Sequence, residues 1–222
     1  MKKTDSTPFI LGITGSIGSG KSAVGRYLTS LGITVIDTDK LVHRLLSEDM
    51  ATKKAIVEQF GEKVLGGEIT AKTGLESSCS GAWSNHEIDR KKLGQIVFAS
   101  EESRRKLEQI VHPNTILALR REVENLKDER LVAVQVPLLF ESNLQGEYDQ
   151  VWTVYTAEPI LRERLKARDH LSDAEIDSRL AAQLPQDSKV KAADQVIDNS
   201  FSEAETERQV KLLVEKILPS KV

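Results

Sequence analysis

Two kinds of hydrophobic pattern alternate along this chain. Short, continuously apolar runs are separated by longer segments in which apolar residues recur every three or four positions. The short runs predict buried strands, because they are rich in β-branched residues and several are bounded by Gly or Pro. These runs are residues 9–14, 33–37, 130–140 (a strand that continues into a proline-started segment), 150–156 and 195–199.

The segments with helical spacing complete the pattern. They are residues 22–31, 40–60 (one or two helices), 88–126 (interrupted near His112-Pro113), 159–168, 173–184 and 203–218. Residues 61–86 are rich in Gly, Ser and Thr and predict a loop. Strands that are apolar throughout and alternate with helices are typical of a parallel sheet covered on both faces, so the predicted fold class is α/β. The helical stretch after the second strand is too long for a simple crossover and predicts a helical subdomain.

Composition excludes several functional classes. The 222 residues are 39% hydrophobic and 29% charged, with a formal net charge of −3. These values favour a soluble cytoplasmic protein without a basic surface for nucleic acid. No apolar run is long enough to span a membrane. The single cysteine, Cys79, allows neither an intramolecular disulfide nor a multi-cysteine zinc site. We expect small-molecule partners and a monomer or weak homo-oligomer.

A glycine-rich motif between the first strand and the first helix supplies the candidate chemistry. Residues 15–22, GSIGSGKS, match G-x-x-x-x-G-K-[ST] in the strand–helix context that a P-loop requires. Its N–H groups form an anion-binding nest, the lysine reaches the β- and γ-phosphates, and the serine hydroxyl can bind Mg²⁺. The motif therefore predicts ATP and Mg²⁺, with Ser22 as metal ligand. The expected nucleotide-binding residues here are Gly15, Gly18, Ser19, Gly20, Lys21, Ser22 and Ala23.

A P-loop identifies the nucleotide but not the reaction. The chain lacks the N-K-x-D motif of GTPases, and the apolar strand that starts at residue 130 ends at Pro137 rather than at an acid. The nearest acids are Asp37 and Asp39, at the end of the second strand, where ligands bind in open parallel sheets. If the extended geometry continues, the two carboxylates point the same way, and Asp39 can serve as general base. The alternative is that Asp39 caps a helix starting at Lys40.

Arginines follow the fourth strand. Arg164 and Arg168 are four residues apart and share one helical face, where fixed positive charge could stabilise a transferring phosphoryl group. We interpret residues of about 159–185 as a lid that carries them. The alternative is a solvated face on which Glu163 and Asp169 neutralise the arginines.

The chain resembles the dephospho-CoA kinase family of P-loop small-molecule kinases. The matching segments span nearly the whole sequence, and "IDTD", "VPLLFE" and "VIDN" in this order are far more specific than the P-loop alone. The segments are "GITGSIGSGKS" (12–22), "LGITVIDTDKL" (31–41), "IVHP" (110–113), "VPLLFE" (136–141), "RLKARD" (164–169), "AAQ" (181–183) and "ADQVIDN" (193–199).

The resemblance implies ATP-dependent phosphorylation of the ribose 3′-hydroxyl of dephospho-CoA. It implies that Asp39 is the base, that Lys21, Arg164 and Arg168 act on the phosphates, and that Asn199 lies near the adenine of ATP. Two residues after Asn199, the chain has Phe201 where the family usually has glycine. The acceptor contacts implied by the resemblance are Asp39, His112, Pro137 and Leu138.

Together these observations predict a single P-loop kinase domain in three parts. The core comprises residues 8–39, 130–157 and 193–222, the acceptor-binding helical subdomain about 40–128, and the lid about 159–185. Two alternatives stay open at this point: another small-molecule kinase, acting on a nucleoside, nucleotide or sugar acid, and an ATP-binding regulator without turnover.

Overall fold

The computed structural model describes residues 7–66 and 87–219. Cys79 and Trp83 lie outside these residues. The chain divides into two compact units, Met1–Asp39 together with Glu122–Val222, and Lys40–Arg121. Each unit is described separately below.

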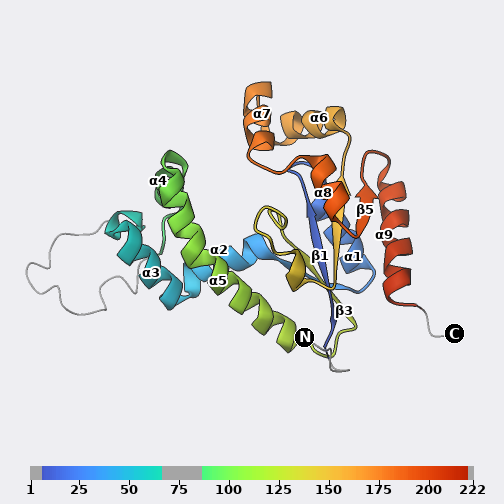
Figure 1. The fold of residues 1–222 in the computed structure, drawn as a ribbon, viewed down its shortest axis with the longest axis horizontal. Helices are drawn as coiled ribbons and strands as arrows, with labels where there is room; N and C mark the ends of the chain where they lie inside the picture. The colour runs from blue at the N-terminus through green and yellow to red at the C-terminus, as the bar shows by residue number, and fades with distance from the viewer. Residues whose placement is uncertain (1–6, 67–86, 220–222) are drawn as a thin grey trace, which may run out of the picture. The chain divides into compact units, whose positions relative to one another are not determined.

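The first unit is built on a five-stranded parallel sheet with the order β2-β3-β1-β4-β5 (Figure 1). The α/β prediction is therefore confirmed. Strand β1 lies at the centre, where Ile13 is in register with Gln135 of β3 and Trp152 of β4. The strands are β1 (Phe9–Gly15), β2 (Thr34–Asp37), β3 (Leu131–Gln135), β4 (Gln150–Tyr155) and β5 (Gln195–Asp198).

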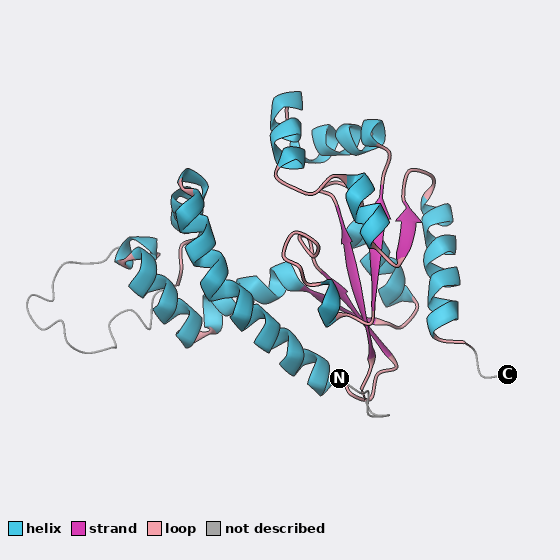
Figure 2. Ribbon diagram, viewed as in Figure 1, coloured by secondary structure: helices cyan, strands magenta, loops and turns pink. Residues whose placement is uncertain are grey.

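Both faces of the sheet are covered. Helices α1 (Lys21–Ser30) and α9 (Glu203–Ile217) pack on one face, in an apolar core that includes Leu11, Ile13 and Trp152 from the sheet. On the other face, Gly12 lies against Leu139 and Tyr148, and α8 (Gln186–Ala192) packs on β4. Figure 2 shows the strands enclosed between these helices. A parallel sheet has to be enclosed in this way, because its apolar strands offer no face suited to water.

Two helices after β4 form the segment interpreted as a lid. They are α6 (Glu158–Asp169) and α7 (Asp173–Ala181), and Ser172 begins α7 with a reciprocal capping box to Glu175. Leu161, Leu165, Leu171 and Ile176 form an apolar cluster of their own, against which Ile17 of the glycine-rich loop packs. This segment therefore rests on the loop.

The second unit is helical. Its elements are α2 (Thr38–Glu48, which starts in the first unit), α3 (Met50–Phe60), a 3₁₀ turn (Glu62–Val64), α4 (Arg90–Ala99) and α5 (Glu101–Asn125, which ends in the first unit). A separate core that includes Leu46, Ile56 and Phe60 holds this unit together.

The predicted interruption of the helix at His112-Pro113 is wrong. Helix α5 runs through Pro113, and the break lies at Ser100, which adopts an extended backbone with φ −147° and ψ 122°. The Ser100 side chain accepts a hydrogen bond from the amide of Ser103 and so caps α5. Near the proline, Asn114 donates its side-chain amide to the carbonyl of Ile110 at 3.0 Å.

None of the helices described is both long and apolar enough to cross a lipid bilayer.

Candidate active site

The glycine-rich loop joins β1 to α1, as its spacing predicts. Helix α1 begins at Lys21, so the amides of Lys21 and Ser22 precede the first helical hydrogen bonds, which run from Ala23 and Val24 to the Gly20 carbonyl, and they can bind an anion. Gly20 has a φ of 96°, and a Cβ there would lie 2.0 Å from the side-chain nitrogen of Asn199. Glycine is required at this position by both the backbone conformation and the neighbouring amide.

Lys21 lies folded over the loop. Its ammonium group donates to the carbonyls of Gly15 at 2.7 Å and Ser16 at 3.0 Å. Burial, and after it the nearby charge of Lys189, lower the pKa of Lys21 from 10.5 to about 8, although Asp39 and Glu141 act in the opposite direction. A bound phosphate group would place further negative charge beside the ammonium of Lys21 and so favour its charged form.

A buried ion pair near the loop was not found by sequence reasoning. Lys189 of α8 is 1% exposed, and its ammonium lies 2.7 Å from a carboxylate oxygen of Glu141. Burial would raise the pKa of Glu141, but Lys189 and the backbone amides around the carboxylate outweigh burial and lower this pKa. The pair comes from segments 48 positions apart, so no local pattern could have revealed it.

The two acids after β2 have different surroundings. Helix α2 begins at Thr38, so the extended geometry that would align the two carboxylates ends at Asp37. Asp37 accepts a hydrogen bond from the amide of Asp39 at 3.0 Å and thus takes the capping role considered for Asp39. Asp39 is exposed in the first turn of α2 and lies close enough to Lys21 to raise its pKa.

The place where many ATPases have an acid at the end of a later strand is taken by Gln135. Its side chain donates to the carbonyl of Lys21 at 3.2 Å and lies against Gly25, where a Cβ would clash with it. Its own carbonyl accepts from the Thr38 hydroxyl at 2.9 Å. Gln135 therefore joins β3 to the start of α1 and α2 rather than offering a carboxylate.

The lid arginines are not equivalent. Arg164 reaches the core, donating to the carbonyl of Asn199 at 3.0 Å and to the Thr156 hydroxyl at 3.4 Å. Arg168 is exposed and makes a bidentate pair with Asp169, which raises the pKa of the arginine. The alternative of a solvated face with a neutralising acid thus describes this contact of Arg168. The charge of Arg168 also lowers the pKa of Lys21.

Asn199 is 6% exposed, and both ends of its side chain are occupied. Its amide nitrogen donates to the carbonyl of Ser19 at 2.8 Å, and its amide oxygen accepts from the Thr206 hydroxyl at 2.9 Å. The side chain expected near adenine therefore binds the glycine-rich loop itself. Phe201, two residues further along, is 65% exposed.

The remaining candidate residues are placed as follows. Ser22 is exposed at the start of α1, and Ala23 donates its amide to the carbonyl of Gly20. Pro137 and Leu138 follow β3 in the first unit, and Leu138 is 42% exposed. His112 lies half-buried on α5 in the second unit, and its role at the acceptor stays a prediction.

The donor set around the loop suits Mg²⁺ bound largely through a nucleotide. No group of three or more His, Cys, Asp or Glu side chains that could hold a metal occurs in the described part of the chain. Mg²⁺ usually takes one or two protein oxygens and completes its shell with phosphate oxygens and water. The exposed hydroxyl of Ser22 at the first turn of α1 fits that requirement.

Comparison with known structures agrees with this geometry. A Thermus thermophilus protein shares 32% sequence identity, with a TM-score of 0.76 over 95% of this chain and 98% of the other. A dephospho-CoA kinase from Campylobacter jejuni shares 28% identity, with a TM-score of 0.64 over 94% and 96%. A shikimate kinase from Acinetobacter baumannii, at 16% identity and a TM-score of 0.50, shares the fold.

Sequence comparison is more specific. Proteins named dephospho-CoA kinase from Carboxydothermus hydrogenoformans and Enterococcus faecalis are 34% and 37% identical to this chain. The alignments cover 93% of this chain and 93% of the first relative, and 96% and 98% for the second. The dephospho-CoA kinase family matches residues 9–74 and 82–205. This chain belongs to the dephospho-CoA kinase family.

Proposed function

We propose that this protein transfers the γ-phosphoryl group of ATP to the 3′-hydroxyl of dephospho-CoA, giving ADP and coenzyme A in the last step of coenzyme A synthesis. The match of the family over most of the chain carries the proposal. The glycine-rich loop, with Lys21 folded over it and Asp39 close enough to act on its charge, supports it.

The residues have distinct roles in the proposed reaction. The first-turn amides of α1 and the ammonium of Lys21 bind the phosphates, and the positive charges stabilise the transferring group. Asp39 accepts the proton of the 3′-hydroxyl. The hydroxyl oxygen bonds to the γ-phosphorus while the bond between the γ-phosphorus and ADP breaks. Mg²⁺, held by the Ser22 hydroxyl and the phosphates, would neutralise charge on the nucleotide. Arg168 would leave Asp169 to contact the γ-phosphate.

The acceptor distinguishes this function from the other small-molecule kinases. Dephospho-CoA carries a pantetheine tail, whose contacts far from the reacting oxygen can help to orient the ribose. We propose that the helical unit, Lys40–Arg121, binds this acceptor through His112 and its neighbours. Pro137 and Leu138 stay predicted acceptor contacts. Adenosine, which lacks the tail, should be a much poorer acceptor. A cytoplasmic location and a monomeric or weakly oligomeric state stay predictions.

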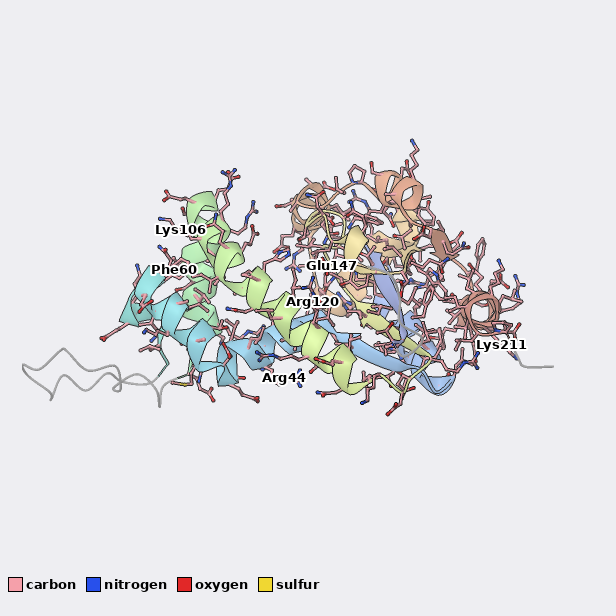
Figure 3. The ribbon with its side chains drawn as sticks, turned by 60° about the horizontal axis from the view of Figure 1, so that its bottom comes forward. Arg44, Phe60, Lys106, Arg120, Glu147 and Lys211 are labelled. Carbon is pink, nitrogen blue, oxygen red and sulfur yellow. The ribbon has the colours of Figure 1, made fainter. Side chains whose placement is uncertain are left out.

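The test is a coupled assay of ADP release with saturating Mg²⁺-ATP, in which dephospho-CoA is compared with adenosine, other nucleosides and shikimate as acceptors. We expect kcat/KM to be highest for dephospho-CoA, with a 3′-phosphorylated product identified by mass spectrometry and NMR. Lys21→Met should abolish transfer, whereas Lys211→Met should not, because Lys211 is exposed on α9 (Figure 3). Equal kcat/KM for dephospho-CoA and adenosine would instead indicate a kinase of broader acceptor range. ATP binding without any product would indicate a regulator.

A further inference from the structure

We propose that Asn199 and Thr156 are positioning residues that set the orientation of one peptide group in the phosphate-binding loop. The peptide in question joins Ser19 to Gly20. Its carbonyl oxygen accepts two side-chain hydrogen bonds, from the Asn199 amide at 2.8 Å and from the Thr156 hydroxyl at 2.9 Å. The inference rests on the proposed function only in that the loop binds the phosphates of ATP.

The consequence for the loop follows from the geometry of a peptide. In a planar trans peptide, C=O and N–H point in opposite directions. Because the carbonyl of Ser19 is held toward Asn199 and Thr156, the N–H of Gly20 is directed away from them. This N–H precedes the first-turn amides of α1 and extends the set of donors that an anion meets there.

The arrangement is built to hold this orientation. Thr156 is fully buried and Asn199 nearly so, and burial keeps water from competing for the carbonyl. The Asn199 side chain is fixed at its other end by the Thr206 hydroxyl at 2.9 Å, and its backbone amide donates to Tyr155 at 2.8 Å. Gly20 must lack a side chain because the Asn199 nitrogen occupies the position that a Cβ would take.

Arg164 links the same network to the lid segment. Its guanidinium contacts the Thr156 hydroxyl at 3.4 Å and the Asn199 carbonyl at 3.0 Å. The residues that follow β4 and β5 thus meet at a single peptide of the loop, and α6 contacts both of them through Arg164. This convergence gives Asn199 a function that does not involve the nucleotide base.

The experiment uses a probe without a base. Binding of inorganic tripolyphosphate and of ATP to the full chain is measured by calorimetry in Mg²⁺, in the wild type and in Asn199→Asp. The substitution keeps the size of the side chain and an oxygen for Thr206, but it replaces the donor to Ser19 with an acceptor and adds a negative charge; Thr156→Val adds no charge and separates the two effects. We expect both ligands to bind about tenfold or more weakly, by similar factors, because the N–H of Gly20 is no longer held toward the phosphates.

Two further variants guard against a general loss of stability. Thr156→Val removes the other donor to Ser19 without changing the shape of the side chain, and should weaken both ligands in the same direction. Asn114→Asp is the matched control, because the Asn114 amide donates to Thr52 at 3.0 Å within the second unit. It should lower the melting temperature without changing the affinity for tripolyphosphate.

The outcomes separate the possibilities. If Asn199→Asp weakens ATP but leaves tripolyphosphate unchanged, Asn199 serves the base and the proposal is overturned. If both affinities stay at the wild-type value in folded Thr156→Val, any loss in Asn199→Asp comes from its added charge, and the proposal is also overturned. Neither measurement needs an acceptor, so a failure to phosphorylate dephospho-CoA would refute the proposed function without deciding this inference.

Discussion

Lys21 is expected to make ATP binding depend on pH in a way that the structure specifies. Burial, with Lys189 nearby, lowers its pKa from 10.5 to about 8. The difference of about 2.5 pH units means that the charged form costs about 3 kcal/mol relative to water. The phosphates of ATP bring negative charge to the ammonium and should restore its pKa. Only the protonated lysine then binds well, so affinity is full below pH 8 and falls as the pH rises through 8.

The size of the effect follows from the fraction of Lys21 that is charged in the free protein. With a pKa of about 8, ATP should bind about tenfold more weakly at pH 9 than at pH 7. Binding should take up about 0.9 proton at pH 9, about 0.5 at pH 8 and about 0.1 at pH 7. Calorimetry at saturating Mg²⁺, in pairs of buffers with different ionisation enthalpies, measures both quantities.

Two variants make this test specific. Lys21→Arg carries a guanidinium that stays charged throughout, so its affinity for ATP should not decline between pH 7 and pH 9. Lys211→Arg makes the same change on the exposed face of α9 and should keep the decline. A wild-type affinity that is constant across this range, with no proton uptake at pH 9, would show that the lysine is not the titrating group.

Three other predictions concern the proposed reaction. Asp39→Asn should lower kcat by about 10²- to 10⁴-fold with little change in the KM for ATP, measured by steady-state kinetics; a larger effect from Asp37→Asn would reverse the assignment. Arg168→Ala should lower kcat and leave the melting temperature unchanged, whereas Arg164→Ala should lower both, because only Arg164 is tied to the core; thermal unfolding that is equal in the two variants would contradict this difference. Gly20→Ala should weaken ATP binding and cost about 1–3 kcal/mol of unfolding free energy in urea titrations, because of its φ of 96° and the neighbouring Asn199.

Much of the fold could be predicted because its signals are local. The apolar runs located all five strands to within a few residues, except that the third ends at Gln135 rather than running on. The glycine-rich loop could be placed because strand, motif and helix follow one another directly. The sequence also predicts a helix near residue 113, with a break at the proline, whereas the extended backbone of Ser100 ends α4 and separates it from α5.

The rest of the site depends on contacts between distant segments, which a single sequence does not reveal. Helix α8 was missed, and with it the burial of Lys189 against Glu141. Asn199 could be singled out through the resemblance, but its contact with Ser19 joins residues 180 positions apart. The contrast between Arg164 and Arg168 likewise depends on what each side chain reaches, although their spacing on the helix is regular.

The position of Ile17 offers a way to follow the contact between the glycine-rich loop and the segment interpreted as a lid. The Ile17 side chain packs with the cluster that includes Leu161, and its amide donates to the Gln183 side chain at 3.0 Å, just beyond α7. For the amide hydrogen of Ile17 to exchange with solvent, the contact with Gln183 has to break. The exchange rate of this hydrogen therefore reports how often the contact between Gln183 and the glycine-rich loop opens.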